Sequence, residues 1–281
     1  MLNFLQSIYS TVKYRALCSF READMEAARI MLRASNTCTD REKELLSRVL
    51  LQIHPFDGMY TPSAPQHYLS VGLSAIRCID EALETESSPP IQSVLDFASG
   101  YGRVLRFLRV RFPDAEIFGC ELKRPAIDFC RRYFDVNAIR SAQHFSKLEL
   151  HKQFDLIWCG SLLTHIDEQA ASQLLNFFYK HLSPGGICVY TTHGPSVVER
   201  IRKREYSYRL TAEAQKNLIE QFEAQDYAYV DHKNKQGYGI SAVRRSKMLA
   251  LADRIGRWKE IFYREKGWDD HQDVYAFKKN G

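Results

Sequence analysis

The chain has 281 residues, of which 45% are hydrophobic and 26% are charged, in the range of a soluble globular protein. Its net charge of +5 is spread along the chain, so it permits a nucleic-acid partner without requiring one. No apolar run approaches the roughly 20 residues needed to cross a bilayer, and the first residues lack the pattern of a secretory signal.

Cysteine usage argues against a disulfide framework. The seven cysteines are dispersed, their number is odd, and no two stand in a C-x-x-C pair. A zinc site is disfavoured for the same reason, and we expect no bound metal. Reduced thiols fit a cytoplasmic protein, which is the location we expect.

Residues 1–88 are expected to form a helical N-terminal extension. The first 20 residues carry apolar side chains at helical spacing, which predicts a helix packed on the main domain or on another subunit of a homo-oligomer. Peripheral membrane contact through this helix is the alternative. Further helices are expected over 22–34, from Thr39-Asp40 to His54-Pro55, and over 67–83. The breaker TESSPP then separates this extension from the rest.

Residues 89–281 alternate between strand and helix patterns. The expected strands are 93–97, 115–121, 137–141, 154–160 and 187–194, and a final antiparallel pair is expected at 261–265 and 273–279. The alternation predicts an α/β fold with a doubly wound, mostly parallel seven-stranded sheet that ends in an antiparallel hairpin. Residues 183–186 are expected to end a helix. Residues 195–240 break the rhythm and are expected to form a lid insertion, followed by a helix at about 242–257.

The stretch SVLDFASGYGRVLRFL places a glycine-containing turn between a buried strand and a helix. Glycine lets the backbone approach a ligand closely, and the free N–H groups of a helix start point at it. Glu121 follows roughly 20 residues later at the end of a strand, where an acid can accept hydrogen bonds from both ribose hydroxyls of an adenosine ligand.

Leu105 stands where a dinucleotide fingerprint has its third small residue, so a ligand without a pyrophosphate fits better. S-adenosylmethionine has adenosine, a sulfonium and an amino-acid tail. Its carboxylate can use backbone N–H groups of the turn, and its cationic groups favour Asp96 and the carbonyls after the fourth strand. A nicotinamide oxidoreductase is the rival prediction.

At these residues the chain resembles the class I S-adenosylmethionine-dependent methyltransferases. VLDFASGYG resembles that family's motif D-x-G-x-G-x-G with Ala98 in place of the first glycine, and FDLIWCGSLLTHI and LSPGGICVYTTHG are similar to two later motifs. The resemblance implies the cofactor S-adenosyl-L-methionine. The cofactor-binding residues it implies are Asp96, Ala98, Ser99, Gly100, Gly102, Arg103, Glu121, Leu122, Cys159, Gly160 and Ser161. The family's third-strand acid has no clear match, and Ser141 or Gln143 is a weak substitute.

The resemblance implies an SN2 methyl transfer, which needs a base only if the acceptor must lose a proton. The candidate bases are His193, His165 and His271, each with a structural role as the alternative. Tyrosines of the lid suit a hydroxylated acceptor, although they also suit lid packing: Tyr206, Tyr208, Tyr227, Tyr229 and Tyr238.

We expect methyl transfer to a hydroxyl of a small molecule or glycan. The alternatives are an RNA or protein methyltransferase and a catalytically silent cofactor-binding partner protein. No Asn/Asp-Pro-Pro-aromatic motif follows the fourth strand, which disfavours methylation of nucleic-acid amines, and no clear nucleic-acid partner is expected.

Overall fold

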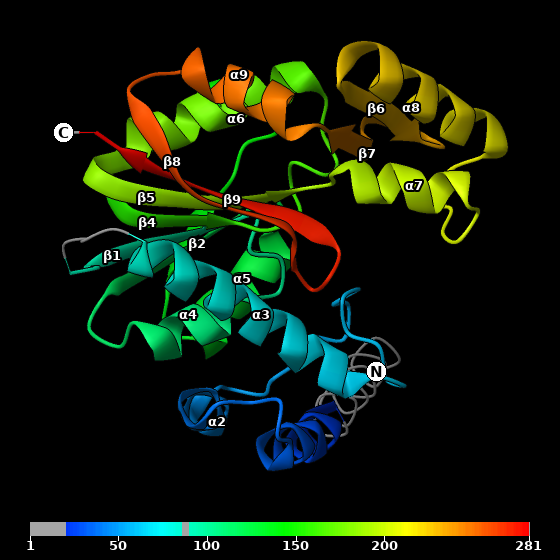
Figure 1. Ribbon diagram of the computed structural model, residues 1–281. Coiled ribbons are helices and arrows are strands. Elements are labelled where there is room, and N and C mark those ends of the chain that lie inside the picture. The colour runs from blue at the N-terminus through cyan, green and yellow to red at the C-terminus, as the bar shows by residue number, and fades with distance from the viewer. Residues whose placement is uncertain (1–20, 86–89, 281) are drawn as a thin grey trace, which may run out of the picture.

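The computed structural model describes residues 21–85 and 90–280, so the helix expected over the first 20 residues lies outside the described part of the chain. Figure 1 shows a central sheet between two layers of helices, with a smaller unit of helices and strands beyond one edge. Within the described ranges, no helix is both long enough and apolar enough to cross a membrane.

The central sheet has seven strands in the order β3-β2-β1-β4-β5-β9-β8. Its strands are β1 Ser93–Phe97, β2 Glu116–Glu121, β3 Asn137–Arg140, β4 Phe154–Cys159, β5 Leu182–Thr192, β8 Trp258–Trp268 and β9 Gln272–Lys279. The first five strands pair in parallel, and β9 pairs antiparallel with both β5 and β8. The predicted fold class is therefore confirmed, including the antiparallel hairpin at its end.

Helices cover both faces of this sheet, as its doubly wound topology requires. The helices packed on it are α3 Pro65–Glu84, α4 Leu105–Arg111, α5 Arg124–Tyr133, α6 Glu168–His181 and α9 Arg245–Asp253. Strand β4 shows the division: Leu156 and Trp158 join the core under α3, α4 and α5, whereas Ile157 and Cys159 join the core under α6 and α9. Because adjacent residues of a strand point to opposite faces, its uninterrupted apolar run fills both cores.

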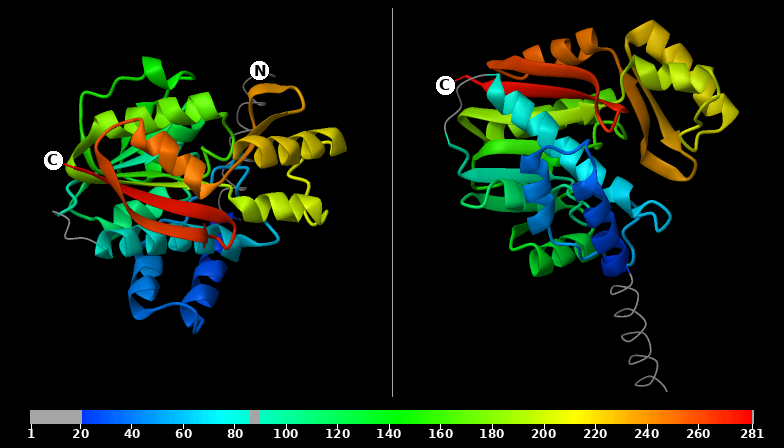
Figure 2. Two further views of the ribbon diagram at one scale, coloured as in Figure 1. Left: turned by 45° about the horizontal axis from the view of Figure 1, so that its top comes forward. Right: turned by 60° about the horizontal axis from the view of Figure 1, so that its bottom comes forward.

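The part of the N-terminal extension before α3 lies against α3 and α4 (Figure 2) and contains a helix over 21–34 and helix α2, Asp40–Arg48. Thr39 caps α2 in a capping box with Glu42. The expectation that this helix continues to His54 is wrong. The backbone becomes extended at Val49, and alternate residues over 49–53 are buried. This segment therefore buries one of its two faces, as a strand does.

The lid insertion is more regular than its sequence predicts. It contains helices α7 Pro195–Arg202 and α8 Ala212–Gln225, and the two-stranded antiparallel sheet of β6 Tyr227–His232 and β7 Lys235–Val243. These elements enclose a core of their own, which includes Val197, Leu218 and Ile240. The following helix, α9, is shorter than expected at both ends.

Strand β5 is longer than expected, because the Ser183–Gly186 turn sequence is drawn into it. Phe154 pairs with Leu182, the register then shifts, and regular pairing resumes between Leu156 and Ile187. The division of the chain into an extension to residue 88 and a main domain from residue 89 stays a prediction.

Candidate active site at the carboxyl edge of the sheet

The predicted site residues follow strands that end at one edge of the sheet. Strands β1, β2, β4 and β5 are parallel, so their carboxyl ends meet there, and β9 begins at the same edge because Thr192 is paired with Asp273. The lid follows β5 directly and stands beyond this edge (Figure 1). An open α/β sheet binds its ligands at this place.

The glycine turn after β1 folds into a left-handed backbone. Its φ angles are +62° at Ala98, +55° at Gly100 and +80° at Gly102. A Cβ atom on Gly102 would lie 2.5 Å from Phe134 Cε2, whereas one on Gly100 would enter open space. Gly100 therefore leaves room at the surface of the turn where a ligand can approach the backbone.

Glu121, at the end of β2, is bound to this turn. Its Oε2 accepts a hydrogen bond from the Gly100 amide at 2.9 Å, and its Oε1 accepts one from the Lys123 amide at 2.9 Å. Each carboxylate oxygen has a further lone pair, so the side chain can still accept hydrogen bonds from a ligand. The next residue, Leu122, is 49% exposed and offers an apolar surface beside it.

Asp96 is a buried acid with an unsatisfied oxygen. It is 2% exposed, and its Oδ2 has no hydrogen-bond partner within the described residues. Burial and the nearby Glu121 charge raise the pKa of Asp96 well above its usual value. A cationic group placed at Oδ2 would stabilise the ionised carboxylate. The hydroxyl of Ser99 is likewise buried without a partner.

Leu105 fills the space between helix and sheet that a dinucleotide fingerprint leaves to a small residue. It is fully buried, and its Cδ2 lies 3.0 Å from where a Cβ on Gly119 of β2 would stand. The small residue of this contact is therefore on the strand and not on the helix.

Arg103 follows the turn and lies near Tyr68 of α3 and Trp268 at the end of β8. Its guanidinium lies 5.9 Å from the ring centres of both Tyr68 and Trp268, and burial lowers its pKa. Trp268 also closes over Gly160, where a Cβ atom would stand 2.8 Å from the indole ring. The turn after β1 and the exit of β4 are thus joined through one tryptophan.

The exit of β4 is fixed by hydrogen bonds to β5 and β9. Ser161 adopts a φ of +66°, and its amide donates to Thr191 Oγ1 at 2.8 Å. Its hydroxyl accepts from Gln272 Nε2 at 3.0 Å. The Cys159 side chain is fully buried in the core under α6, so only its backbone can reach a ligand.

Two predicted histidines are held by the same lid strand. His165 Nδ1 lies 2.7 Å from Gly239 O, and His193 Nδ1 lies 3.0 Å from Ser241 O. Because a carbonyl only accepts, each Nδ1 carries the proton and each Nε2 keeps its lone pair. Burial lowers the pKa of His165, and it lowers that of His193 to about 3. Both rings are therefore neutral at pH 7.

His271 is arranged differently. Arg200 Nη1 lies 2.8 Å from its Nδ1, and since a guanidinium only donates, that nitrogen accepts. The Nε2 proton then faces the Tyr208 hydroxyl at 3.5 Å. Burial and the Arg200 charge lower the pKa of His271. Its one lone pair is engaged, which leaves His193, 5.3 Å away between ring centres, better placed to take a proton.

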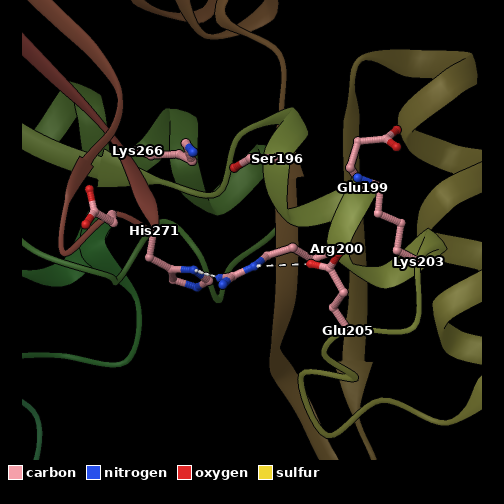
Figure 3. Close-up of a pocket in the computed structure, with 8 residues that line it drawn as sticks. Ser196, Glu199, Arg200, Lys203, Glu205, Lys266 and His271 are labelled. Carbon is pink, nitrogen blue, oxygen red and sulfur yellow. Dashed lines mark hydrogen bonds and ion pairs between the residues drawn. The ribbon is translucent and has the colours of Figure 1, made fainter.

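A pocket of about 270 Å³ opens beside His271, between α7 and the turn that joins β8 to β9 (Figure 3). The residues that line it are all of polar or charged types: Ser196, Glu199, Arg200, Lys203, Glu205, Lys266, Asp270 and His271. Figure 3 shows His271 and Glu205 reaching toward Arg200 from opposite sides. An adjoining hollow is lined by Tyr206 and Asp269 as well.

Sequence reasoning missed several residues of this edge. Trp268 and Gln272 join strand exits, and Arg200 lines the pocket beside His271. A usable signal was the position of GWDDHQ in the turn of the final hairpin, since an antiparallel last strand brings that turn to the carboxyl edge.

A family model described as "Methyltransferase domain" matches residues 94–186, which run from β1 into β5 and include the glycine turn, Glu121 and the exit of β4. A comparison with curated proteins finds no match.

Solved structures show the same fold at low sequence identity. A S-adenosylmethionine-dependent methyltransferase from Clostridium acetobutylicum ATCC 824 is 14% identical, with 76% of this chain and 92% of that one aligned at a TM-score of 0.52. SAM-bound CalS10, an amino pentose methyltransferase from Micromonospora echinaspora, is 16% identical over 75% and 92% of the two chains, with a TM-score of 0.51. The sugar N-methyltransferase KedS8 from Streptoalloteichus sp ATCC 53650 is 16% identical over 75% and 88%, with a TM-score of 0.53.

The family match covers the first two sequence motifs and the LSPGG that opens the third. Residues 94–186 therefore form a methyltransferase domain, and the chain has the fold of S-adenosylmethionine-dependent methyltransferases.

Proposed function

We propose that this enzyme transfers the methyl group of S-adenosylmethionine to a hydroxyl of a small molecule or glycan. The observation that carries the proposal is the pocket between α7 and the β8–β9 turn, whose wall residue His271 lies 5.3 Å, between ring centres, from the neutral His193 after β5. A pocket with these walls suits an acceptor that is rich in hydroxyl groups.

The cofactor fits the turn after β1 and the ends of the neighbouring strands. The unsatisfied Oδ2 of Asp96 is the partner for its ammonium group, and Arg103 is the partner for its carboxylate. Glu121 takes the ribose hydroxyls, and Leu122 lies beside the adenine. Backbone groups of 159–161 flank the sulfonium.

The bound cofactor supplies an electrophilic methyl carbon. The protein holds the acceptor oxygen in line with the S–C bond and keeps water out. Methyl transfer would make the acceptor oxygen strongly acidic, with the S–C bonding pair left on the cofactor sulfur. His193 Nε2 is the group that would take the proton of that oxygen. A weakly basic imidazole suffices for this step, which fits the lowered pKa of His193.

A sugar is the acceptor class that we favour. Tyr206 is 58% exposed at the hollow beside the pocket and contacts the buried Tyr208 edge-on, with ring centres 4.7 Å apart. Such rings stack on the C–H faces of sugars. Tyr227 and Tyr229 have internal hydrogen bonds instead, and Tyr238 stacks on His165, so these three pack the lid. The names of CalS10 and KedS8 add that this fold accommodates sugar acceptors.

The test is transfer of a labelled methyl group into fractionated cell extract. Label recovered in the glycan or sugar fraction, and lost with His193→Ala, supports the proposal. Label recovered in RNA or protein would support the alternative acceptors, and undiminished transfer by His193→Ala would remove that residue from the reaction.

A further inference from the structure

A buried arginine joins the glycine turn to the N-terminal extension. Arg106, in the first turn of α4, is 1% exposed. Its Nε donates to Gly102 O at 2.9 Å, and its Nη1 donates to Leu50 O at 2.9 Å. One guanidinium therefore binds the turn with one edge and the extension with another, which a planar, multiply donating group is suited to do.

The charge of Arg106 is compensated through the extension. Its carbon Cζ lies 5.1 Å from the ring centre of Tyr68 and 4.6 Å from that of Phe134. The Tyr68 hydroxyl accepts from Nη2 at 3.3 Å and donates to Asp57 Oδ2 at 2.7 Å. Asp57 is 5% exposed, and its other oxygen accepts from the Met59 amide. A buried cation with this set of partners is held in one geometry.

A second contact holds the turn from its outer side. The ring of Tyr101, between the two glycines, stacks on His54 with ring centres 4.4 Å apart and planes 16° apart. Phe129 packs against the edge of both rings. His54 and Leu50 belong to the same extended segment of the extension, so this segment touches the turn at two places.

We propose that the segment from Leu50 to Tyr68, together with Arg106, is a clamp that keeps the glycine turn in its cofactor-binding conformation. Three of the five residues of the turn have positive φ. The two glycines adopt it without steric cost but stay flexible and Ala98 is strained, so contacts from outside hold the turn in one conformation. Arg106 is a positioning residue, since it acts through Gly102 O and not on the cofactor. The inference rests on the proposed placement of the cofactor at this turn.

The test uses changes that leave the buried guanidinium in place. Tyr68→Phe keeps the ring and removes the hydroxyl between Arg106 and Asp57, and His54→Ala removes the stack on the turn. If the cofactor-binding conformation of the turn is then populated to only about one tenth, affinity for S-adenosylhomocysteine falls about tenfold, because apparent affinity scales with the population of the binding conformation. Calorimetry on the full chain measures this, and amide exchange at 100–103 without ligand should rise.

Two controls separate clamping from mere stability. His54→Phe restores a stacking ring and should bind within about twofold of wild type. Arg111→Met removes the ion pair between α4 and Asp80 of α3, away from the turn, and should lower the unfolding temperature without lowering affinity.

Folded Tyr68→Phe and His54→Ala proteins that bind as tightly as wild type would overturn the clamp. Glu121→Ala is the reference for the site itself. If it loses binding while the clamp variants keep it, the clamp alone is wrong; if it also keeps binding, the cofactor placement is wrong, and the clamp with it.

Discussion

Ala98 occupies a backbone position that favours glycine. A left-handed conformation costs a non-glycine residue about 1–2 kcal/mol, and glycine loses about 0.4–1 kcal/mol through its more flexible unfolded chain. We therefore expect Ala98→Gly to raise the free energy of unfolding by about 0.5–1 kcal/mol, as measured with urea.

The matched change is Gly100→Ala, at a φ of +55° with no atom within 4 Å of the new methyl group. It should destabilise the protein by about 1 kcal/mol, because strain is added without a clash. A stability loss on Ala98→Gly would instead mean that the Ala98 methyl group packs favourably enough to outweigh its strain.

His193 gives stability a definite dependence on pH. The folded protein keeps it neutral down to about pH 3, whereas the unfolded chain takes up its proton below about pH 6.5. Its contribution is complete above pH 6.5 and is lost as the pH falls toward 3. Between pH 7 and pH 5, wild type should lose about 2 kcal/mol more than His193→Gln, whose amide can still donate to Ser241 O. Equal losses in urea titrations would contradict this.

Some site residues can be predicted from the sequence and others cannot. Asp96 and Glu121 could be predicted because each ends a strand beside a recognisable turn. The proton positions of His165 and His193 could not, because they depend on carbonyls of β7 that come from a distant part of the chain. The burial of Arg106 could not be predicted either, since Leu50 and Tyr68, with which it forms hydrogen bonds, lie in the extension.

At the scale of elements, β7 joins the lid to the strand exits. Gly239 exchanges backbone and side-chain hydrogen bonds with His165, and the Ser241 amide donates to Thr164 O. A Cβ atom on Gly239 would lie 1.8 Å from Val230 O, so Gly239→Ala must displace β7. We expect labelled methyl transfer to fall about 100-fold, the contribution of a positioned base, with S-adenosylhomocysteine affinity unchanged.

Gly237→Ala is the control for that prediction. Gly237 has a φ of +73° but open space around it, so the change adds strain to the hairpin without moving β7. Transfer should persist in this variant. A loss of cofactor binding in Gly239→Ala would contradict the separation of lid and cofactor site.

Element boundaries failed where tertiary contacts override local pattern. Residues 49–53 continue an apolar run that suits a helix. They are extended instead, because alternate residues of the segment are buried. Strand β7 was not predicted, because its first half contains glycine and lysine, which are poor strand formers. Its second half is fully buried, which decides its conformation.

At the scale of the whole molecule, the mostly parallel seven-stranded sheet and its final antiparallel hairpin followed from alternation of strand and helix patterns, whereas the order of the strands did not. Alternation could not predict how the added parts dock. These are the residues before α3, which pack on α3 and α4, and the lid, which packs on the exits of β4 and β5. These contacts join residues far apart in the chain, and no local pattern encodes them.

The most direct test of the account is calorimetric titration of S-adenosylhomocysteine into wild type, Glu121→Ala and Glu121→Gln. We predict saturable binding to wild type and a loss of about 100-fold in Glu121→Ala, since two hydrogen bonds to a charged acceptor disappear. Glu121→Gln, which keeps one acceptor oxygen, should lie between them. Equal affinity of all three proteins, or binding of NAD in place of S-adenosylhomocysteine, would contradict the placement of the cofactor at the glycine turn.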